Sequence, residues 1–272
     1  MSRYLIIGAH PDDADLRFGG TAFKLTRAGH QVKFVSVANG NCGHQSMSGA
    51  PLAARRFQEA QRTRAFNGAC EYEVLDNSDC EVMPDLPTRK RLIAVIRGFA
   101  PDVVLSHRLC DYHADHRNTA QLVLDCAYLV KVPMFVPEAP VPAVEPVFGY
   151  FWDDFTDPRP PHVDAAVPLE DDVVEQKCRA LDCHVSQFYE WLPFDSGFSP
   201  IDPVATPWPR RLEYLKEHWM QRNIRSANAA RELLRSRYGV ERGDAIRYTE
   251  NFEYSPYGRH VTPEEFQALF PA

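Results

Sequence analysis

The first half of the chain alternates short apolar runs with segments whose apolar residues recur at helical spacing. The apolar runs have the length of strands and lie at 4–8, 32–37, 71–75 and 102–106. The helical segments follow them at 18–28, 52–68, 86–99 and 118–130. Four strand–helix units in succession predict an α/β fold, a Rossmann-like three-layer domain with a mostly parallel, doubly wound sheet.

The second half differs because prolines become frequent. Of the 22 prolines, 14 lie between Pro133 and Pro209. Proline interrupts regular elements, so mostly short elements are expected in this part of the chain. The remaining predicted elements are strands over 147–151 and 163–167, and helices over 170–183 and 210–238.

Composition narrows the class of protein. The 30 Lys and Arg against 37 Asp and Glu give a net charge of −7, which argues against binding to a nucleic-acid backbone. No apolar stretch approaches the ~20 residues of a membrane span, and the first residues lack the apolar core of a signal peptide. The seven cysteines include no Cys-x-x-Cys pair, so neither a disulfide scaffold nor a cysteine zinc site is indicated. We expect a cytoplasmic protein with a small-molecule partner; a monomer and a homo-oligomer both remain open.

A histidine and two carboxylates follow the first predicted strand, in the sequence His10-Pro11-Asp12-Asp13. Ligands bind at the carboxyl ends of strands in an open α/β sheet, and these side chains offer nitrogen and oxygen atoms to a metal. One Asp can be a ligand while its neighbour acts as a general base. The alternative is a turn in which proline fixes φ and an Asp caps the next helix. The G-x-G-x-x-G spacing of a dinucleotide site is absent.

A second polar cluster follows the fourth predicted strand and contains His107, Asp111, His113, Asp115 and His116. A polar loop with an Asp as helix cap would account for a single histidine. In the strand order 3-2-1-4, however, strands one and four are neighbours, so both clusters converge on one crevice. Two histidines and one carboxylate with an open position form the ligand set of hydrolytic zinc sites. The remaining Asp and His suit a water-activating base and an oxyanion-stabilising acid.

Together these residues resemble the PIG-L/LmbE-like family of zinc-dependent N-deacetylases, which includes N-acetylglucosaminyl deacetylases. The family has a His-Pro-Asp-Asp motif after its first strand and a His-x-Asp-His motif after a later one; here they occupy residues 10–13 and 113–116. Similar stretches occur at 19–21, 56–59, 177–187 and, more loosely, 257–259. The resemblance therefore reaches into the proline-rich half.

The resemblance implies that His10, Asp13 and His116 bind Zn²⁺ or another divalent metal. It also shows two departures from the family pattern. Ala14 stands where the family commonly has Glu, and Ala114 stands where the second motif has Pro. The Glu is not an implied ligand, so its loss need not abolish zinc binding; it bears instead on the contacts around the ligands and on substrate preference.

The resemblance further implies how the reaction is divided among the other motif residues. Asp12 would be the general base that activates the attacking water. His113 would stabilise the oxyanion or protonate the leaving amine, and Asp115 would orient the ring of His113. The products would be acetate and a free amine.

Candidates for substrate contact are Arg56, Asp79, His184 and Tyr112. Arg56 and Asp79 resemble positions that contact a polar substrate in relatives, and both side chains can bond to hydroxyl groups. The structural alternatives are a salt bridge from Arg56 to Glu59 and a capping role for Asp79. His184 either approaches the crevice or packs at a helix end, and Tyr112 lies on a rim loop.

We expect residues 1–272 to form a single deacetylase domain. Within it, residues 1–132 are the Rossmann-like catalytic core, and residues 133–272 supply a proline-rich pocket wall and a C-terminal helical region. Proline reduces the entropy that a loop loses on ordering, which suits a preformed wall.

Three functions compete. The leading hypothesis is a zinc-dependent hydrolase that removes the acetyl group from an N-acetylated amino sugar or its conjugate. The second hypothesis is a metal-dependent amidase that cleaves another small amide, such as a thiol conjugate. A third is a non-catalytic module that binds a nucleotide, against which the missing phosphate-loop glycines count. A panel of amides separates the first two, and tight nucleotide binding without metal would favour the third.

Overall fold

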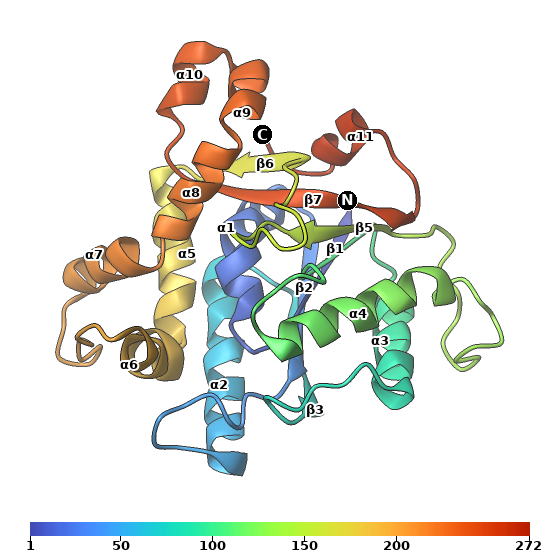
Figure 1. Ribbon diagram of the computed structural model, residues 1–272, viewed down its shortest axis with the longest axis horizontal. Coiled ribbons are helices and arrows are strands. Elements are labelled where there is room, and N and C mark those ends of the chain that lie inside the picture. The colour runs from blue at the N-terminus through green and yellow to red at the C-terminus, as the bar shows by residue number, and fades with distance from the viewer.

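A seven-stranded sheet runs through the middle of the computed structural model, which describes residues 1–272 (Figure 1). Its strands are β1 (Arg3–Gly8), β2 (Gln31–Ala38), β3 (Glu71–Asn77), β4 (Val103–Ser106), β5 (Val147–Phe151), β6 (Ala165–Pro168) and β7 (Thr249–Gly258). Their order across the sheet is β3-β2-β1-β4-β5-β7-β6. Neighbours from β3 to β5 are parallel, whereas β7 is antiparallel to β5 and β6. The predicted α/β class and the order 3-2-1-4 are confirmed.

Helices cover both faces of this sheet. They are α1 (Asp13–Arg27), α2 (Gly49–Asn67), α3 (Leu86–Phe99), α4 (Ala114–Leu129), α5 (Asp171–Cys183), the π-helix η1 (Ser186–Trp191), α6 (Leu192–Ser196), α7 (Trp208–His218), α8 (Gln221–Ala229), α9 (Arg231–Tyr238), α10 (Val240–Ala245) and α11 (Pro263–Ala268). Helices α1, α2 and α5 lie on one face, and α3 and α4 lie on the other (Figure 1).

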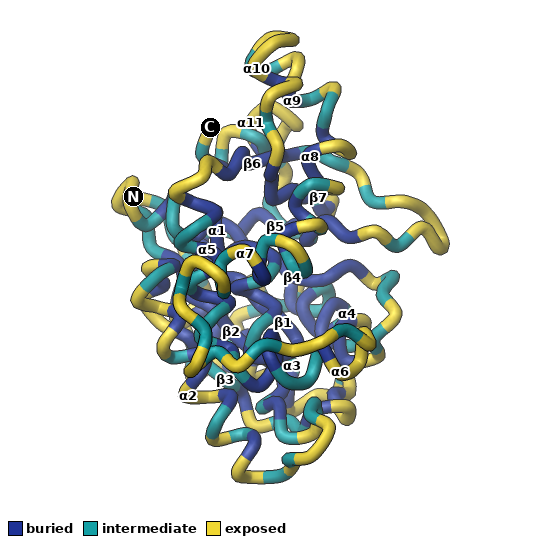
Figure 2. The backbone as a smooth tube through the Cα atoms, turned by 90° about the vertical axis from the view of Figure 1, so that its left-hand side faces the viewer, coloured by how far each residue is buried: buried dark blue, intermediate teal, exposed yellow.

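Apolar side chains alternate between the two faces of the central strand β1, as the two-residue period of a strand requires. Tyr4 and Ile6 belong to a buried cluster shared with α1, α2 and α5, whereas Leu5 and Ile7 belong to a second cluster shared with α3 and α4. Figure 2 shows the strands as the buried middle of the molecule, with exposed segments in the loops and outer helices. The sheet is therefore a platform covered on both faces.

Helices α1 and α4 begin earlier than the periodicity predicts, at Asp13 and Ala114. Both first turns lie inside a polar motif, where the apolar spacing that marks a helix is missing. His113 is the N-cap of α4, and its Nδ1 atom accepts a hydrogen bond from the backbone N–H of Asp115 at 3.1 Å. Each motif is thus a helix N-terminus at the carboxyl edge of the sheet.

A buried ion pair joins α1, α5 and β7. Lys177 Nζ lies 2.5 Å from Glu250 Oε1, and both side chains are at most 1% exposed. Glu250 also accepts hydrogen bonds from the backbone N–H groups of Gly20 and Thr21. A Cβ atom at Gly20 would lie 2.8 Å from Leu169 Cδ2, so glycine lets α1 approach its neighbour closely. These contacts give the Gly-Gly-Thr stretch and Lys177 a structural role.

The prediction of one final helix over 210–238 is wrong. The chain there forms α7, α8 and α9, with breaks at Trp219-Met220 and at Ala230. Helix α7 packs on α5, α8 on β7 and α9 on α10. A single straight helix cannot bury its apolar residues against three surfaces that face different ways, so the chain turns between them.

Strand β7 is not indicated by the hydrophobic pattern. Its residues Glu250, Asn251 and Glu253 are polar but buried. Their partners come from distant parts of the chain; for example, Asn251 Nδ2 donates to the backbone carbonyl of Ser226 at 2.7 Å. The π-helix η1 and the short helices α6, α10 and α11 are also absent from the sequence prediction.

Candidate active site

A tight turn between β1 and α1 brings His10 and Asp13 side by side. The backbone N–H of Asp12 donates to the carbonyl of His10, and the backbone N–H of His10 donates to Asp13 Oδ2, both at 2.8 Å. The turn passes close to the end of β1, where a Cβ atom at Gly8 would lie 2.6 Å from Asp13 Cβ. Glycine at the end of the strand therefore lets the carboxylate of Asp13 approach the sheet edge.

His107 and His116 come from the loop after β4 and from α4, and their rings stack with centroids 4.2 Å apart. Asp111 Oδ2 lies 3.0 Å from His116 Nδ1, so His116 presents Nε2 to Asp13. His107 Nε2 lies 3.2 Å from Asp13 Oδ2. Burial and the neighbouring His116 lower the pKa of His107 to about 4, which keeps its ring neutral. Sequence reasoning placed His107 and Asp111 in the cluster but gave neither a role.

Ligand-type atoms of three residues meet where the two motifs converge. His10 Nδ1 lies 3.2 Å from His116 Nε2 and 3.5 Å from Asp13 Oδ2. His116 Nε2 lies 3.6 Å from Asp13 Oδ1. Ligands at about 2.0–2.1 Å from a tetrahedral zinc ion are separated from one another by about 3.3–3.4 Å. The two imidazoles and the carboxylate therefore fit such an ion in both chemistry and spacing.

His113 lies beside this triangle, with its ring centroid 4.7 Å from that of His10. Asp115 contacts the ring of His113 through its backbone N–H, and its carboxylate points elsewhere. That carboxylate lies 3.3 Å from His10 Nε2 and accepts a hydrogen bond from the backbone N–H of Cys80 at 2.7 Å. Residues two apart in a helical turn point to different sides. The side chain of Asp115 therefore points to His10, whereas its backbone N–H donates to the ring of His113.

Asp12 is the N-cap of α1 and is held by Arg56. Arg56 Nη2 lies 3.4 Å from Asp12 Oδ1, and Arg56 Nη1 donates to Asp79 Oδ2 at 3.2 Å. Asp79 Oδ1 lies 3.1 Å from His10 Nε2. Burial opposes the charge on Asp79, but the hydrogen bond and charge of His10, together with Arg56, lower its pKa well below the usual range. The expected alternative, an Arg56–Glu59 salt bridge, does not form, because Glu59 pairs with another arginine.

The loop between β2 and α2 packs closely over Arg56. Gly40 has φ +75, and a Cβ atom there would lie 2.7 Å from Arg56 Cδ. A Cβ atom at Gly43 would lie 3.0 Å from both Arg56 Nη1 and Asp79 Oδ2. The backbone N–H of Gly43 donates to that same Asp79 oxygen at 3.0 Å. The two glycines allow the backbone to cover the Arg56–Asp79 pair.

The π-helix η1 fastens this loop to the second half of the chain. Gln187 Nε2 donates to the carbonyl of Gly43 at 3.0 Å, and Glu190 Oε2 lies 2.8 Å from His44 Nε2. Arg55 of α2 donates to the same Glu190 oxygen at 2.8 Å. π-Helices are rare and frequent at functional sites. The resemblance over 177–187 was the one sequence signal that pointed to this segment.

His184 does not reach the site. It is 1% exposed, and its Nε2 atom lies 2.9 Å from Asp15 Oδ2. Asp15 also accepts a hydrogen bond from Asn67 at 2.7 Å. His184 is therefore a packed histidine at the end of α5, which is the alternative that the sequence left open, and it has no access to a substrate.

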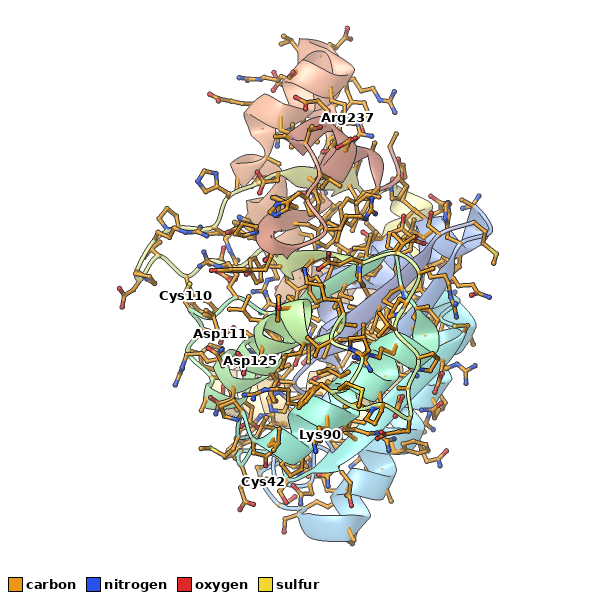
Figure 3. The ribbon with its side chains drawn as sticks, turned by 90° about the vertical axis from the view of Figure 1, so that its right-hand side faces the viewer. Cys42, Lys90, Cys110, Asp111, Asp125 and Arg237 are labelled. Carbon is orange, nitrogen blue, oxygen red and sulfur yellow. The ribbon has the colours of Figure 1, made fainter.

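Tyr112 lies at the rim of an open cleft. Its ring packs near Phe155 and His116, with centroids 5.7 Å and 5.9 Å away, although 73% of the residue is exposed. The cleft has a volume of about 580 Å³ and is lined by residues 109–112, 117 and 154–158. Figure 3 shows Cys110 and Asp111 of this loop at the edge of the molecule beside α4. The rim position of Tyr112 agrees with the sequence, and its contact with substrate stays a prediction.

Comparisons with known proteins agree with this geometry. Residues 5–127 match the PIG-L family model, described as GlcNAc-PI de-N-acetylase. The chain is 30% identical over 209 residues to diacetylchitobiose deacetylase of Thermococcus kodakarensis, which covers 71% of this chain and 75% of that relative. It is 27% identical over 154 residues to 4-oxalmesaconate hydratase of Pseudomonas putida, and this match covers 54% of this chain and 59% of that relative.

Two solved structures share the fold. N,N'-diacetylchitobiose deacetylase of Pyrococcus horikoshii, in complex with an inhibitor, superposes with a TM-score of 0.65 at 23% identity, over 94% of this chain and 84% of that one. GalB, the 4-carboxy-2-hydroxymuconate hydratase of Pseudomonas putida, superposes with a TM-score of 0.71 at 21% identity, over 96% of this chain and 99% of that one.

A mostly parallel sheet whose two His/Asp motifs meet at the carboxyl ends of β1 and β4, together with the match to the PIG-L family model, defines an α/β enzyme of the deacetylase class. More specifically, the chain belongs to the PIG-L family, and we assign it to the hydrolases that act on amides. None of its helices combines the length and the hydropathy needed to span a bilayer.

Proposed function

We propose that the protein is a zinc-dependent N-deacetylase that acts on an N-acetylated amino sugar or a conjugate of one. The observation that carries the proposal is the triangle of residues His10, Asp13 and His116. His10 Nδ1 lies 3.2 Å from His116 Nε2 and 3.5 Å from Asp13 Oδ2, and His116 Nε2 lies 3.6 Å from the other oxygen of Asp13, Oδ1. The relatives named diacetylchitobiose deacetylase support an acetylated amino sugar as the substrate class.

His10, Asp13 and His116 would hold the zinc ion. A cation bound there would act as a Lewis acid toward the amide carbonyl and would acidify water. Asp115 contacts the far nitrogen of His10, and Asp111 contacts that of His116. Such outer contacts fix the orientation of ligand rings, so both carboxylates support the site without being ligands themselves.

Asp12 is suited to remove the proton of the attacking water. Its side chain is 14% exposed, compared with 8% for Asp13, 3% for Asp79 and 1% for Asp115, so it is the carboxylate of the group with most access to the site. Arg56 holds it in place from behind. Because Arg56 and Asp79 are buried behind Asp12, we assign both to positioning rather than to direct substrate contact.

His113 is suited to stabilise the oxyanion. Burial and the charges of His10 and His116 lower its pKa. Its Nδ1 atom accepts the backbone N–H of Asp115, so the proton of the neutral ring lies on Nε2. That N–H would donate to the carbonyl oxygen. The water oxygen would bond to the acetyl carbon while Asp12 takes the proton of the water; the carbon–nitrogen bond would then break as Asp12 passes that proton to the leaving amine.

We also propose that residues 133–272 form the wall of the substrate pocket within a single domain. Residues 154–158 line the cleft beside Tyr112, and η1 fastens the loop over Arg56 through Gln187 and Glu190. Both segments belong to the proline-rich half, so this half would contribute one side of the entrance, while the first half contributes the other side and the reacting groups.

The test is acetate release from N-acetylglucosamine, diacetylchitobiose and larger conjugates, with chelator and with added zinc. The proposal expects release that chelation abolishes and zinc restores. Cleavage of bulkier amides, including a thiol conjugate, without action on acetamido sugars would favour the amidase instead. Because one relative is named a hydratase, 4-oxalmesaconate is included. Its consumption without acetate release from any amide would contradict the proposal.

A further inference from the structure

Two aromatic rings from distant parts of the chain meet in the cleft beside the metal-ligand candidates. Tyr112 belongs to the loop before α4 and Phe155 to the segment after β5, and their ring centroids lie 5.7 Å apart with 55° between the planes. Tyr112 is 73% exposed, and Phe155 is half-buried. The cleft that both rings line has a volume of about 580 Å³, within the range of small-molecule sites. The two rings therefore offer a substrate apolar surface that the fold itself leaves partly uncovered.

Tyr112 connects this cleft with the reacting groups. Its ring centroid lies 5.8 Å from that of His113 and 5.9 Å from that of His116, and the ring planes meet at 84° and 73°. His113 is the residue proposed to stabilise the oxyanion, and His116 is a proposed ligand. A group that lies against Tyr112 is thus adjacent to the position of the acetamide, so one substrate molecule can occupy both places.

A buried arginine holds the segment that carries Phe155. Arg108 is 3% exposed, and its Nε and Nη2 atoms donate to the two carboxylate oxygens of Asp153, at 2.9 Å and 3.1 Å. Arg108 Nη2 also donates to the backbone carbonyl of Phe155 at 2.9 Å, and the backbone N–H of Phe155 donates to Asp153 Oδ1 at 2.9 Å. The Arg108–Asp153 pair thus holds both backbone polar groups of Phe155. Because Arg108 directly follows His107, this pair links the segment to the loop beside the proposed ligands.

A second arginine holds the loop that carries Tyr112. Arg117 of α4 donates from Nη1 to the backbone carbonyls of Asp111 and Tyr112, at 2.6 Å and 2.9 Å. Both aromatic residues are therefore held through their backbones. Groups that are in place before a ligand arrives lose little entropy on binding, so this arrangement suits a preformed binding site.

Part of the cleft lining is polar. Thr156 and Asp157 line the cleft with exposed side chains that offer a hydroxyl and a carboxylate. A pyranose ring has hydroxyl groups at its edge and C–H groups on its faces, so it matches aromatic rings bordered by hydrogen-bonding groups. An acyl chain has no polar edge and would make no use of Thr156 and Asp157. The lining therefore favours a sugar over a lipid chain.

We propose that Tyr112 and Phe155 form a subsite for a second sugar ring of the substrate, and that the Arg108–Asp153 pair positions this subsite. The inference rests on the proposed deacetylase function and narrows its substrate class to molecules in which the acetylated amino sugar is linked to another sugar. The second ring lies against Tyr112 and Phe155 while the acetamide of the first ring reaches the proposed metal site.

The test compares N-acetylglucosamine with its dimer, diacetylchitobiose, by acetate release from zinc-loaded protein. The wild type is expected to favour the dimer in kcat/KM by about 5- to 30-fold, the range expected of two aromatic contacts, which exceeds the advantage of a second acetamide. Tyr112→Ala and Phe155→Ala should each reduce this preference by about 3- to 10-fold, through a higher KM for the dimer. Phe155→Tyr keeps the ring and should keep the preference.

Tyr128→Ala is the matched control for Tyr112→Ala, because Tyr128 is also an exposed tyrosine but lies near the far end of α4. It should keep the preference for the dimer. Equal kcat/KM for the two sugars, or an unchanged preference in both Tyr112→Ala and Phe155→Ala, would overturn the subsite while the deacetylase function stands.

N-hexanoylglucosamine covers the other occupant of the cleft, an acyl chain. A preference for it over N-acetylglucosamine that Tyr112→Ala removes would assign the cleft to the acyl group and overturn the proposal. No such preference is expected.

Asp153→Asn tests the positioning role. It weakens the hold of Arg108 on the Phe155 segment and should reduce the preference through a higher KM for the dimer. Arg108→Lys, which keeps the charge but not the paired N–H groups, gives the same test if Asp153→Asn does not fold. An equal loss of activity toward both sugars would overturn the positioning role.

Failure of the deacetylase function itself gives a different result, namely no acetate from either sugar. Calorimetric binding of diacetylchitobiose to zinc-loaded protein then decides the subsite. Tighter binding to the wild type and to Tyr128→Ala than to Tyr112→Ala and Phe155→Ala supports it, and equal binding to all four proteins overturns it.

Discussion

Arg56 Nη2 lies 3.4 Å from the carboxylate of Asp12, so a side chain of α2 holds the residue that caps α1. The same guanidinium contacts Asp79, which reaches His10. The proposed base and a proposed ligand are therefore held by one connected group of buried charges. Their arrangement depends on the loop that covers Arg56, and this dependence can be tested residue by residue.

Asp12→Asn should remove the proton acceptor and leave the metal site intact. We expect kcat to fall by about 10²- to 10⁴-fold, the usual contribution of a general base, with zinc content unchanged. Steady-state acetate release and metal analysis of the same preparation measure both quantities. A variant that keeps wild-type kcat would show that another group takes the proton.

Gly40→Ala should disturb Arg56 and thereby Asp12. Its Cβ atom would lie 2.7 Å from Arg56 Cδ, so the guanidinium has to move, and we expect a lower kcat with zinc content retained. Gly29→Ala is the control, because Gly29 also has a positive φ, +85, but nothing lies within 4 Å of the added atom. Both substitutions carry backbone strain, and only Gly40→Ala should reduce activity. Equal activities would mean that the loop does not position Asp12.

Lys177→Met should destabilise the fold strongly, because it leaves the carboxylate of Glu250 buried without its cation. Breaking a buried ion pair in this way costs about 3–5 kcal/mol. The Lys177→Met/Glu250→Gln double variant should recover part of that loss in urea unfolding. Arg179→Met, which removes a partly exposed pair with Glu175, should change the unfolding free energy little. A small effect at Lys177 would contradict the structural role given to this pair.

Glu190 should contribute stability that depends on pH. Burial opposes its ionisation, but hydrogen bonds from Arg55 and His44 lower its pKa below the value of an unfolded glutamate. Because the folded pKa is lowered, the contribution is present above the unfolded pKa of about 4.3 and is lost as the pH falls through the folded value. Glu190→Gln should therefore reduce the unfolding free energy at pH 7, and this difference should shrink toward pH 3. A difference that does not vary with pH would count against the ion pair.

The sequence predicts the parallel part of the fold and the meeting of the two motifs. Short apolar runs separated by helical segments specify β1 to β4, and the strand order places His10 and His116 at one edge. It does not predict β7, because Glu250 and Asn251 lie where a buried strand is expected to be apolar. Their partners, such as Lys177, are far away in the chain and become visible only in the folded structure.

Some contacts in the site could not be predicted from the sequence either, because they depend on side-chain directions in the folded chain. The carboxylate of Asp115 lies on His10 rather than His113 because the first turn of α4 points its side chains in two directions. The local sequence does not indicate which histidine the side chain of Asp115 contacts.

The zinc content of His116→Ala tests most directly whether the His10–Asp13–His116 triangle is the metal site of a deacetylase. The wild type is expected to hold about one zinc ion per chain and to release acetate from an acetamido sugar. His116→Ala should lose the zinc and the acetate release together, while His260→Ala, which changes an exposed histidine, keeps both. Full zinc occupancy and undiminished acetate release in His116→Ala would contradict the proposed site.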